Sequence, residues 1–246
     1  MVDIKQILHD EIIKNRPNLG ISSIKTYLSI LSNLNKQMNG DKNLDWFQTD
    51  HVKILDYLDK KNDQTKKTTL AALYILTGLK EYQTVMNSIM KKVNDIYKDQ
   101  KTNTQQEENW ISIDEIKTKY NALHLDAISM LNKKKILNEN VMMEFLLISF
   151  LSGILIPPRR SLDFSELKIR NFEVKIDNYY KSGKLHFNKY KTSKTYGLQI
   201  VDLPKELNTI LKKWIKINTK DYMIYSTNGK KISCPQITRI LNIRIL

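Results

Sequence analysis

The chain has 246 residues, with 40 Lys or Arg against 26 Asp or Glu, which gives a formal net charge of +14. Its single cysteine, Cys234, excludes an intramolecular disulfide and fits a reducing compartment. No window approaches 18 uncharged apolar residues, and the N-terminus lacks the cationic start of a secretory signal, so we expect an intracellular protein with no membrane partner.

The first hundred residues predict a bundle of four or so helices. Ser22 and Ser23 precede apolar residues at helical spacing, which predicts an amphipathic helix with a hydroxyl cap. Further helical patterns cover residues 50–59, 65–77 and 82–97. We expect these helices to pack together as one domain.

A polar segment then divides the chain. Residues 98–109, "KDQKTNTQQEEN", contain no apolar side chain and lie between two strongly patterned regions. We therefore predict two domains, residues 1–97 and residues 110–246, joined by residues 98–109 as a linker.

The second domain begins and ends with helices. Ser112 with Glu115 three residues later forms a capping box, and residues 138–152 are apolar nearly all round, as in a central buried helix. Pro204 opens a helix that continues to Trp214, and Ser233 caps a last short helix.

Between these helices the pattern changes to short runs rich in β-branched and aromatic residues. The runs cover residues 172–176, 184–190 and 197–203, and they predict a three-stranded antiparallel sheet with a basic second turn. The expected fold is therefore mainly α with a small antiparallel β-sheet, an α+β class.

The positive charge is concentrated in the last third of the chain. Residues 168–246 carry 17 basic against 5 acidic side chains, whereas residues 1–100 have a net charge of +3 and residues 101–167 of −1. A surplus of this size favours a polyanion such as nucleic acid as partner. A solvated Lys-rich surface accounts for the charge alone equally well.

Arg159 and Arg160 are adjacent although Arg supplies only 6 of the 40 basic residues. Arg presents a planar fork of donors that matches phosphate, and it tolerates partial burial better than Lys. The preceding Pro-Pro pair is expected to end the buried helix and to direct both side chains toward a groove. The alternative is an ion pair with Asp163 or Glu166 one turn later.

Three lysines crowd the predicted hairpin turn: Lys189, Lys191 and Lys194. Like charges so close repel one another unless an anion lies between them. A Lys on such a turn can reach a phosphate backbone and protonate a leaving oxygen. If the hairpin stood alone, a solvated basic turn would be the favoured interpretation.

The segment "SGILIPPRRSLDFSELKIRNF" resembles the first conserved box of the tyrosine recombinases, the phage-integrase family. In that box a catalytic Arg is followed three residues later by an acid, and Arg160 with Asp163 fits this spacing. The Pro-Pro-Arg-Arg variant is similar to integrases of large DNA viruses and virophages, in which Arg159 competes for the catalytic role.

The hairpin fits the same family, which carries a catalytic Lys on a turn between two strands. Lys191, followed by Thr192, matches that position. The N-terminal helices resemble the core-binding domain with which the family clamps duplex DNA, and the second domain resembles its catalytic domain. The resemblance makes four further residues expected DNA contacts: Lys189, Lys194, Lys25 and Arg170.

The family's later motifs are not recognisable in this sequence. A second Arg in an H-x-x-R box and a nucleophilic Tyr are expected after the hairpin, but Arg239 and Arg244 have no partner His. Tyr222 and Tyr225 fall before that box, and we expect them to pack in a strand. The chain therefore resembles a C-terminally shortened recombinase, and whether it is an enzyme stays open.

The resemblance implies a DNA integrase that cuts and rejoins double-stranded DNA through a phosphotyrosine. It implies self-association on DNA, a viral or other mobile genetic element, no metal or nucleotide cofactor and no small-molecule substrate. The alternative is a nonenzymatic DNA-binding protein that keeps the clamp without the chemistry. Type IB topoisomerases share the fold, but their boxes match these residues less well.

Overall fold

The computed structural model describes residues 3–40, 43–100, 102 and 104–245. It divides into two compact units, Met1–Glu107 and Glu108–Leu246, and each unit has a hydrophobic core of its own. The division falls within the expected linker, where a short helix, α7, spans Thr104–Glu108. Residues 101 and 103 of that linker lie outside the described residues.

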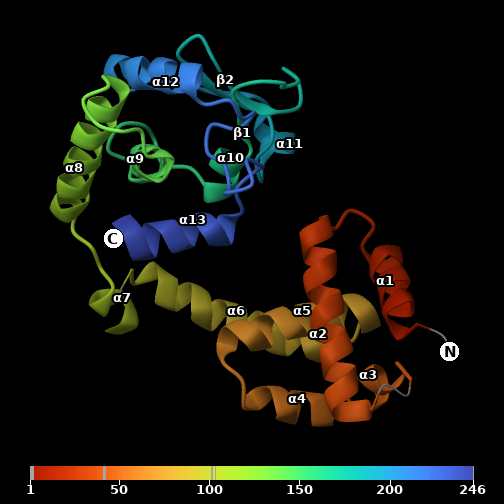
Figure 1. The fold of residues 1–246 in the computed structure, drawn as a ribbon. Helices are drawn as coiled ribbons and strands as arrows, with labels where there is room; N and C mark the ends of the chain where they lie inside the picture. The colour runs from red at the N-terminus through yellow and green to blue at the C-terminus, as the bar shows by residue number, and fades with distance from the viewer. Residues whose placement is uncertain (1–2, 41–42, 101, 103, 246) are drawn as a thin grey trace. The chain divides into compact units, whose positions relative to one another are not determined.

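The first unit is a helical bundle (Figure 1). Its helices are α1 (Ile4–Asn15), α2 (Ile21–Asn39), α3 (Trp46–Thr49), α4 (His51–Asp59), α5 (Asp63–Thr77) and α6 (Lys80–Lys98). The prediction of four helices missed α1, which Asp3 caps by accepting a hydrogen bond from the backbone N–H of Lys5, 3.0 Å away. Leu8 and Ile12 of α1 are buried, so this helix contributes to the core.

The cap predicted for α2 was wrong. The N-cap is Gly20 in an extended conformation, and Ser22 and Ser23 lie inside the first turn of the helix. Glycine is accepted at an N-cap because the position needs non-helical backbone angles, which glycine adopts without a steric cost. The buried Leu31 and Leu34 confirm the predicted amphipathic pattern.

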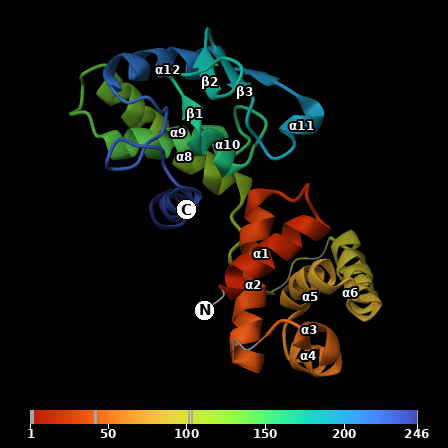
Figure 2. The ribbon, with the colours of Figure 1, turned by 90° about the vertical axis from the view of Figure 1, so that its right-hand side faces the viewer.

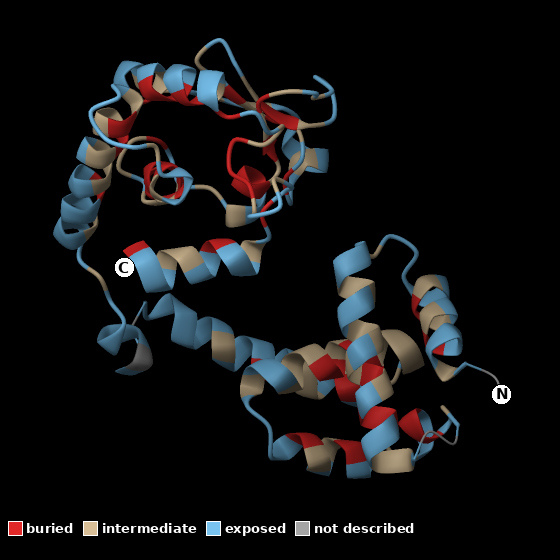
Figure 3. Cartoon of the chain, in the orientation of Figure 1, coloured by how far each residue is buried: buried red, intermediate tan, exposed pale blue. Residues whose placement is uncertain are grey.

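The second unit surrounds a central helix with helices and a sheet (Figures 1 and 2). Its elements are α8 (Ile113–Leu131), α9 (Glu139–Leu151), α10 (Ser161–Ser165), β1 (Leu167–Lys168), β2 (Asn178–Lys181), β3 (Lys184–Phe187), α11 (Ser193–Tyr196), β4 (Gln199–Asp202), α12 (Lys205–Ile217), α13 (Cys234–Ile240) and η1 (Leu241–Ile245). Figure 3 shows buried residues along α9 and on parts of α8, α12 and α13. The mainly α fold with a small sheet is confirmed.

Several predicted helix ends of this unit are confirmed. Ser112 and Glu115 form the capping box of α8, and Ser233 forms a second one at α13. The predicted buried helix at residues 138–152 matches α9 with its caps, but the expectation that the Pro-Pro pair ends it was wrong, because α9 stops at Leu151. Gly153, with φ of +78°, then turns the chain into the left-handed region that glycine favours.

The sheet differs from the predicted one. It has four strands in the order β1-β2-β3-β4, with β1 parallel to β2 and the other pairs antiparallel. Residues 172–176 form no strand; Val174 and Ile176 stay exposed, and Phe172 stacks on Tyr179 of β2. The strand comes later, at Asn178–Lys181, and the turn at Ser182 and Gly183 has φ of +52° and +83°, the geometry of a two-residue hairpin.

Because α9 is buried along its length, truncation of Leu146 is expected to destabilise the second unit strongly. Leu146 is fully buried, and Leu146→Ala is expected to lower the free energy of unfolding by about 2–5 kcal/mol. Hydrogen exchange of the α9 amides measures the loss. The control is Ile136→Ala at a side chain that is 95% exposed, with an expected change within about 0.5 kcal/mol.

Candidate nucleic-acid interface

Arg159 joins the segment after α9 to the sheet. Its Nε donates to Oδ2 of Asp163 at 3.1 Å, and its Nη1 donates to Oε1 of Gln199 in β4 at 2.6 Å. The guanidinium carbon lies 4.1 Å from the ring centroid of Phe187 and 5.1 Å from that of Tyr190. Of the two adjacent arginines, Arg159 therefore forms an ion pair with Asp163, which was the alternative to a phosphate contact.

Asp163 is a buried carboxylate, with 3% of its surface exposed. Burial raises the pKa of Asp163 above its ordinary value, while the neighbouring Arg159 and Arg160 act in the opposite direction. Its Oδ1 has no hydrogen-bond partner among the described residues. The arginines therefore offset part of the cost of burying this carboxylate.

Arg160, in contrast, is exposed. It is the N-cap residue of α10, where its backbone is extended. Arg160 lines a surface pocket of about 500 Å³ together with Thr192 and Tyr196 of the β3–β4 connection. The remaining lining residues are Pro158, Arg159, Asp163, Tyr190 and Gln199. The pocket therefore brings the Arg pair together with the segment that contains Lys191.

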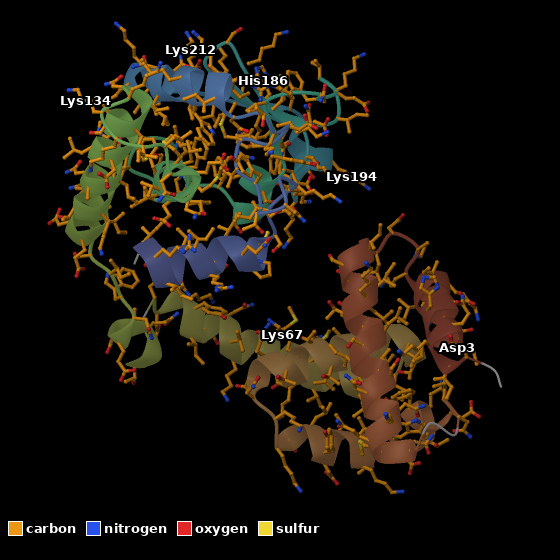
Figure 4. The ribbon with its side chains drawn as sticks, in the orientation of Figure 1. Asp3, Lys67, Lys134, His186, Lys194 and Lys212 are labelled. Atoms are coloured by element: carbon orange, nitrogen blue, oxygen red, sulfur yellow. The ribbon has the colours of Figure 1, made fainter. Side chains whose placement is uncertain are left out.

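The β3–β4 connection is longer than a tight turn, and it contains α11. Lys191 and Lys194 are exposed on it and form no ion pair with a described residue; Figure 4 labels Lys194. The Tyr190 hydroxyl donates to the carbonyl oxygen of Gly197 at 2.7 Å, which closes the base of the connection. Lys191 follows Tyr190 directly, so its backbone is fixed at the edge of the pocket although its side chain does not line it.

Glu166 holds two lysines at one side of this region. Lys189 Nζ lies 2.9 Å from its Oε2, and the Nζ of Lys231, which the sequence reasoning did not single out, pairs with Oε1. Burial acts to raise the pKa of Glu166, but the hydrogen bonds from Lys231 and Lys189 outweigh it, so the net pKa lies below its ordinary value. This cluster joins the β3–β4 connection to the segment before α13.

The other two expected DNA contacts lie elsewhere. Arg170 donates through Nη1 to the carbonyl oxygen of Lys220 at 3.0 Å and through Nη2 to that of Ile215, so its guanidinium binds the end of α12. Lys25 is exposed on α2 in the first unit. The DNA contact of each stays a prediction.

The tyrosines considered as nucleophiles are packed into the structure. Tyr225 is 8% exposed and stacks on Trp214, and burial raises its pKa above the ordinary value. Tyr222 is half-buried and pairs by its backbone with Lys168. Neither phenol lines the pocket beside Arg160. The exposed Tyr196 does line it, and the sequence reasoning missed it because its spacing matches no motif.

No protein-family model matches the chain, and no curated protein matches it. The solved structures include a crystal structure of XerA recombinase that aligns with 12% identity and a TM-score of 0.33, over 96% of this chain and 74% of that chain. A similarity at this level does not establish a shared fold.

The described residues contain no helix that is both long and apolar enough to span a membrane. They also contain no group of three or more His, Cys, Asp or Glu side chains placed to hold a metal ion.

The Glu166 cluster predicts a pH-dependent stability. Because the folded pKa of Glu166 lies below 4.5, its contribution is complete above about pH 4.5 and is lost as the pH falls through the folded pKa. Glu166→Gln is expected to cost about 1 kcal/mol at pH 7, since both lysines are partly exposed.

Urea unfolding at a series of pH values measures this difference. The wild type and Glu166→Gln are expected to converge in acid, and a difference that stays constant from pH 7 to pH 3 contradicts the assignment. Glu173→Gln is the control, because Glu173 is exposed and forms no ion pair with a described residue.

Proposed function

We propose that the chain is a DNA-binding protein of the tyrosine recombinase type, which holds a backbone phosphate of duplex DNA between Arg160 and Lys191. The observation that carries the proposal is the pocket in which exposed Arg160 lies beside the β3–β4 connection. The resemblance of "PPRRSLD" and "KYKT" to the family's boxes supports the same two residues. The unit Met1–Glu107 takes the role of the DNA clamp.

In the cleavage reaction that the resemblance implies, a tyrosine oxygen bonds to the phosphorus as the bond from phosphorus to the 5′ oxygen breaks, and each residue has a defined part in it. Arg160 neutralises charge on the nonbridging phosphate oxygens, and Lys191 protonates the departing 5′ oxygen. Arg159 positions the loop through Asp163 and Gln199 rather than contacting the phosphate, since its Nε and Nη1 are already engaged. The similarity to integrases of large DNA viruses and virophages, and self-association on DNA, belong to this proposal.

A nonenzymatic DNA-binding protein is the second candidate function. The observation that favours it is the burial of Tyr225 and the packing of Tyr222, which leave neither phenol free to attack a phosphate. Binding requires only the exposed cations, whereas cleavage requires an accessible phenol in line with the leaving oxygen. The recombinase and the nonenzymatic protein are therefore distinguished by DNA cleavage and not by their affinity for DNA.

Binding to duplex DNA is expected to weaken steeply with salt, because lysines and arginines that neutralise phosphates release counterions. Arg160→Ala is expected to weaken binding about tenfold and to reduce the salt slope by about one, as the loss of one phosphate contact does. Fluorescence anisotropy of a labelled duplex at several salt concentrations measures both. Lys36→Ala, at an exposed Lys of α2, is the matched control, and equal effects of the two changes contradict the role of Arg160.

A nicked suicide substrate separates the enzyme from the binding protein. An active chain is expected to form a covalent adduct, which Lys191→Ala abolishes with little change in affinity, because its ammonium acts on the leaving oxygen. Denaturing electrophoresis detects the adduct, and mass spectrometry of its peptides identifies the tyrosine. Salt-sensitive binding without any adduct leaves the nonenzymatic function.

A further inference from the structure

A second surface of the Glu108–Leu246 unit lies between α8 and α12. It is a groove of about 430 Å³ with an apolar floor made by Ile128, Leu131 and Ile210. Lys205 and Lys213 stand at its rim, together with Asn132, Glu206 and Thr209. It shares no lining residue with the pocket at Arg160, and Figure 4 shows Lys134 and Lys212 on this side of the unit and Lys194 away from it.

The groove is surrounded by positive charge. Lys213 Nζ donates to Oδ1 of Asn132 at 2.7 Å, which places the end of α8 and its three following lysines beside α12. Glu206 is the acid in the lining, and it lies 3.1 Å from Nε2 of His124. An apolar side chain with acidic neighbours is the complement of such a surface.

The same unit carries a segment with that chemistry. Residues 108–115, "ENWISIDE", contain three acids and no base. Trp110 is 74% exposed and Ile113 is 51% exposed, whereas Trp46 and Trp214 are buried. An exposed Trp with apolar and charged neighbours is the residue type that most often anchors a protein interface.

We propose that residues 108–115 of one copy of the chain dock into the α8–α12 groove of a second copy. The segment leads into the N-terminus of α8, while Ile128 and Leu131 lie near its other end, and the helix of 19 residues is about 28 Å long. A chain therefore does not fill its own groove. Two copies related by a two-fold axis, with their α8 helices antiparallel, exchange both segments at once.

The apolar floor favours this occupant over nucleic acid. A phosphate backbone would neutralise the lysines but would place charged oxygens against the exposed parts of Ile128 and Leu131, which are partly buried against the core. Trp110 supplies the apolar group, and Glu108 and the two acids of the first turn of α8 supply negative charge beside it, although Glu115 also accepts from Ser112 and Asp114 pairs with Lys117. The inference does not rest on DNA binding, and duplex DNA enters its test only as the competing occupant of the groove.

Sedimentation velocity of the full chain over a range of concentrations tests the proposal. The wild type is expected to dimerise, and Trp110→Ala is expected to weaken the dimer at least about tenfold, as the loss of an anchoring Trp does. Thr209→Glu places a carboxylate between Lys205 and Lys213, one turn to either side, and is expected to weaken the dimer similarly. Ile136→Ala removes an exposed apolar side chain outside both surfaces and is the control.

A mixture of the two variants distinguishes reciprocal docking from general damage. Trp110→Ala keeps an intact groove and Thr209→Glu keeps an intact segment, so the mixture is expected to form a mixed dimer more readily than either variant alone. A monomeric wild type at all concentrations overturns the proposal. So does a dimer unaffected by both changes, and so does a Thr209→Glu variant that loses affinity for duplex DNA while still dimerising.

Discussion

The ion pair between Arg159 and Asp163 is the interaction on which the candidate interface depends. It is formed in a buried site, with the guanidinium against the rings of Phe187 and Tyr190. Breaking a buried pair by removing one partner typically costs about 3–5 kcal/mol, because the remaining charge stays in the interior. The pair therefore holds the Arg159 guanidinium in place, and the same guanidinium joins the segment before α10 to β4 through Gln199.

This pair divides two adjacent arginines between two tasks. Arg159 is committed to Asp163 and Gln199, so it cannot turn toward a ligand without leaving a buried carboxylate uncompensated. Arg160 follows at the start of α10 with an extended backbone and an exposed side chain. Of the two arginines, Arg159 is therefore engaged within the fold, and Arg160 is the one that the proposal assigns to a phosphate.

The helices that could be predicted from the sequence are those marked by the spacing of their apolar residues or by a capping residue. The capping boxes of α8 and α13 and the buried helix α9 follow from residues close together in the chain. The run at 172–176 has strand-forming residues, but an exposed Val174 contributes nothing to the core, so tertiary packing placed β2 elsewhere. The strand propensity of the residues cannot show whether residues 172–176 or residues 178–181 pair with a neighbouring strand.

The basic residues of the candidate site could be singled out from the sequence, but the contacts that they make in the fold could not. Arginine scarcity singled out Arg159 and Arg160, but Gln199 is 40 residues away and carries no motif that links it to them. The same limit applies to Glu166, whose lysine partners come from both sides of β4 in the chain. An ion pair between distant residues depends on the topology of the sheet, and one sequence contains no signal for it. These ion pairs nevertheless decide which basic side chains can bind a polyanion. Arg159 is paired with Asp163, and Lys189 and Lys231 are paired with Glu166, so each would have to give up a carboxylate partner to bind a phosphate.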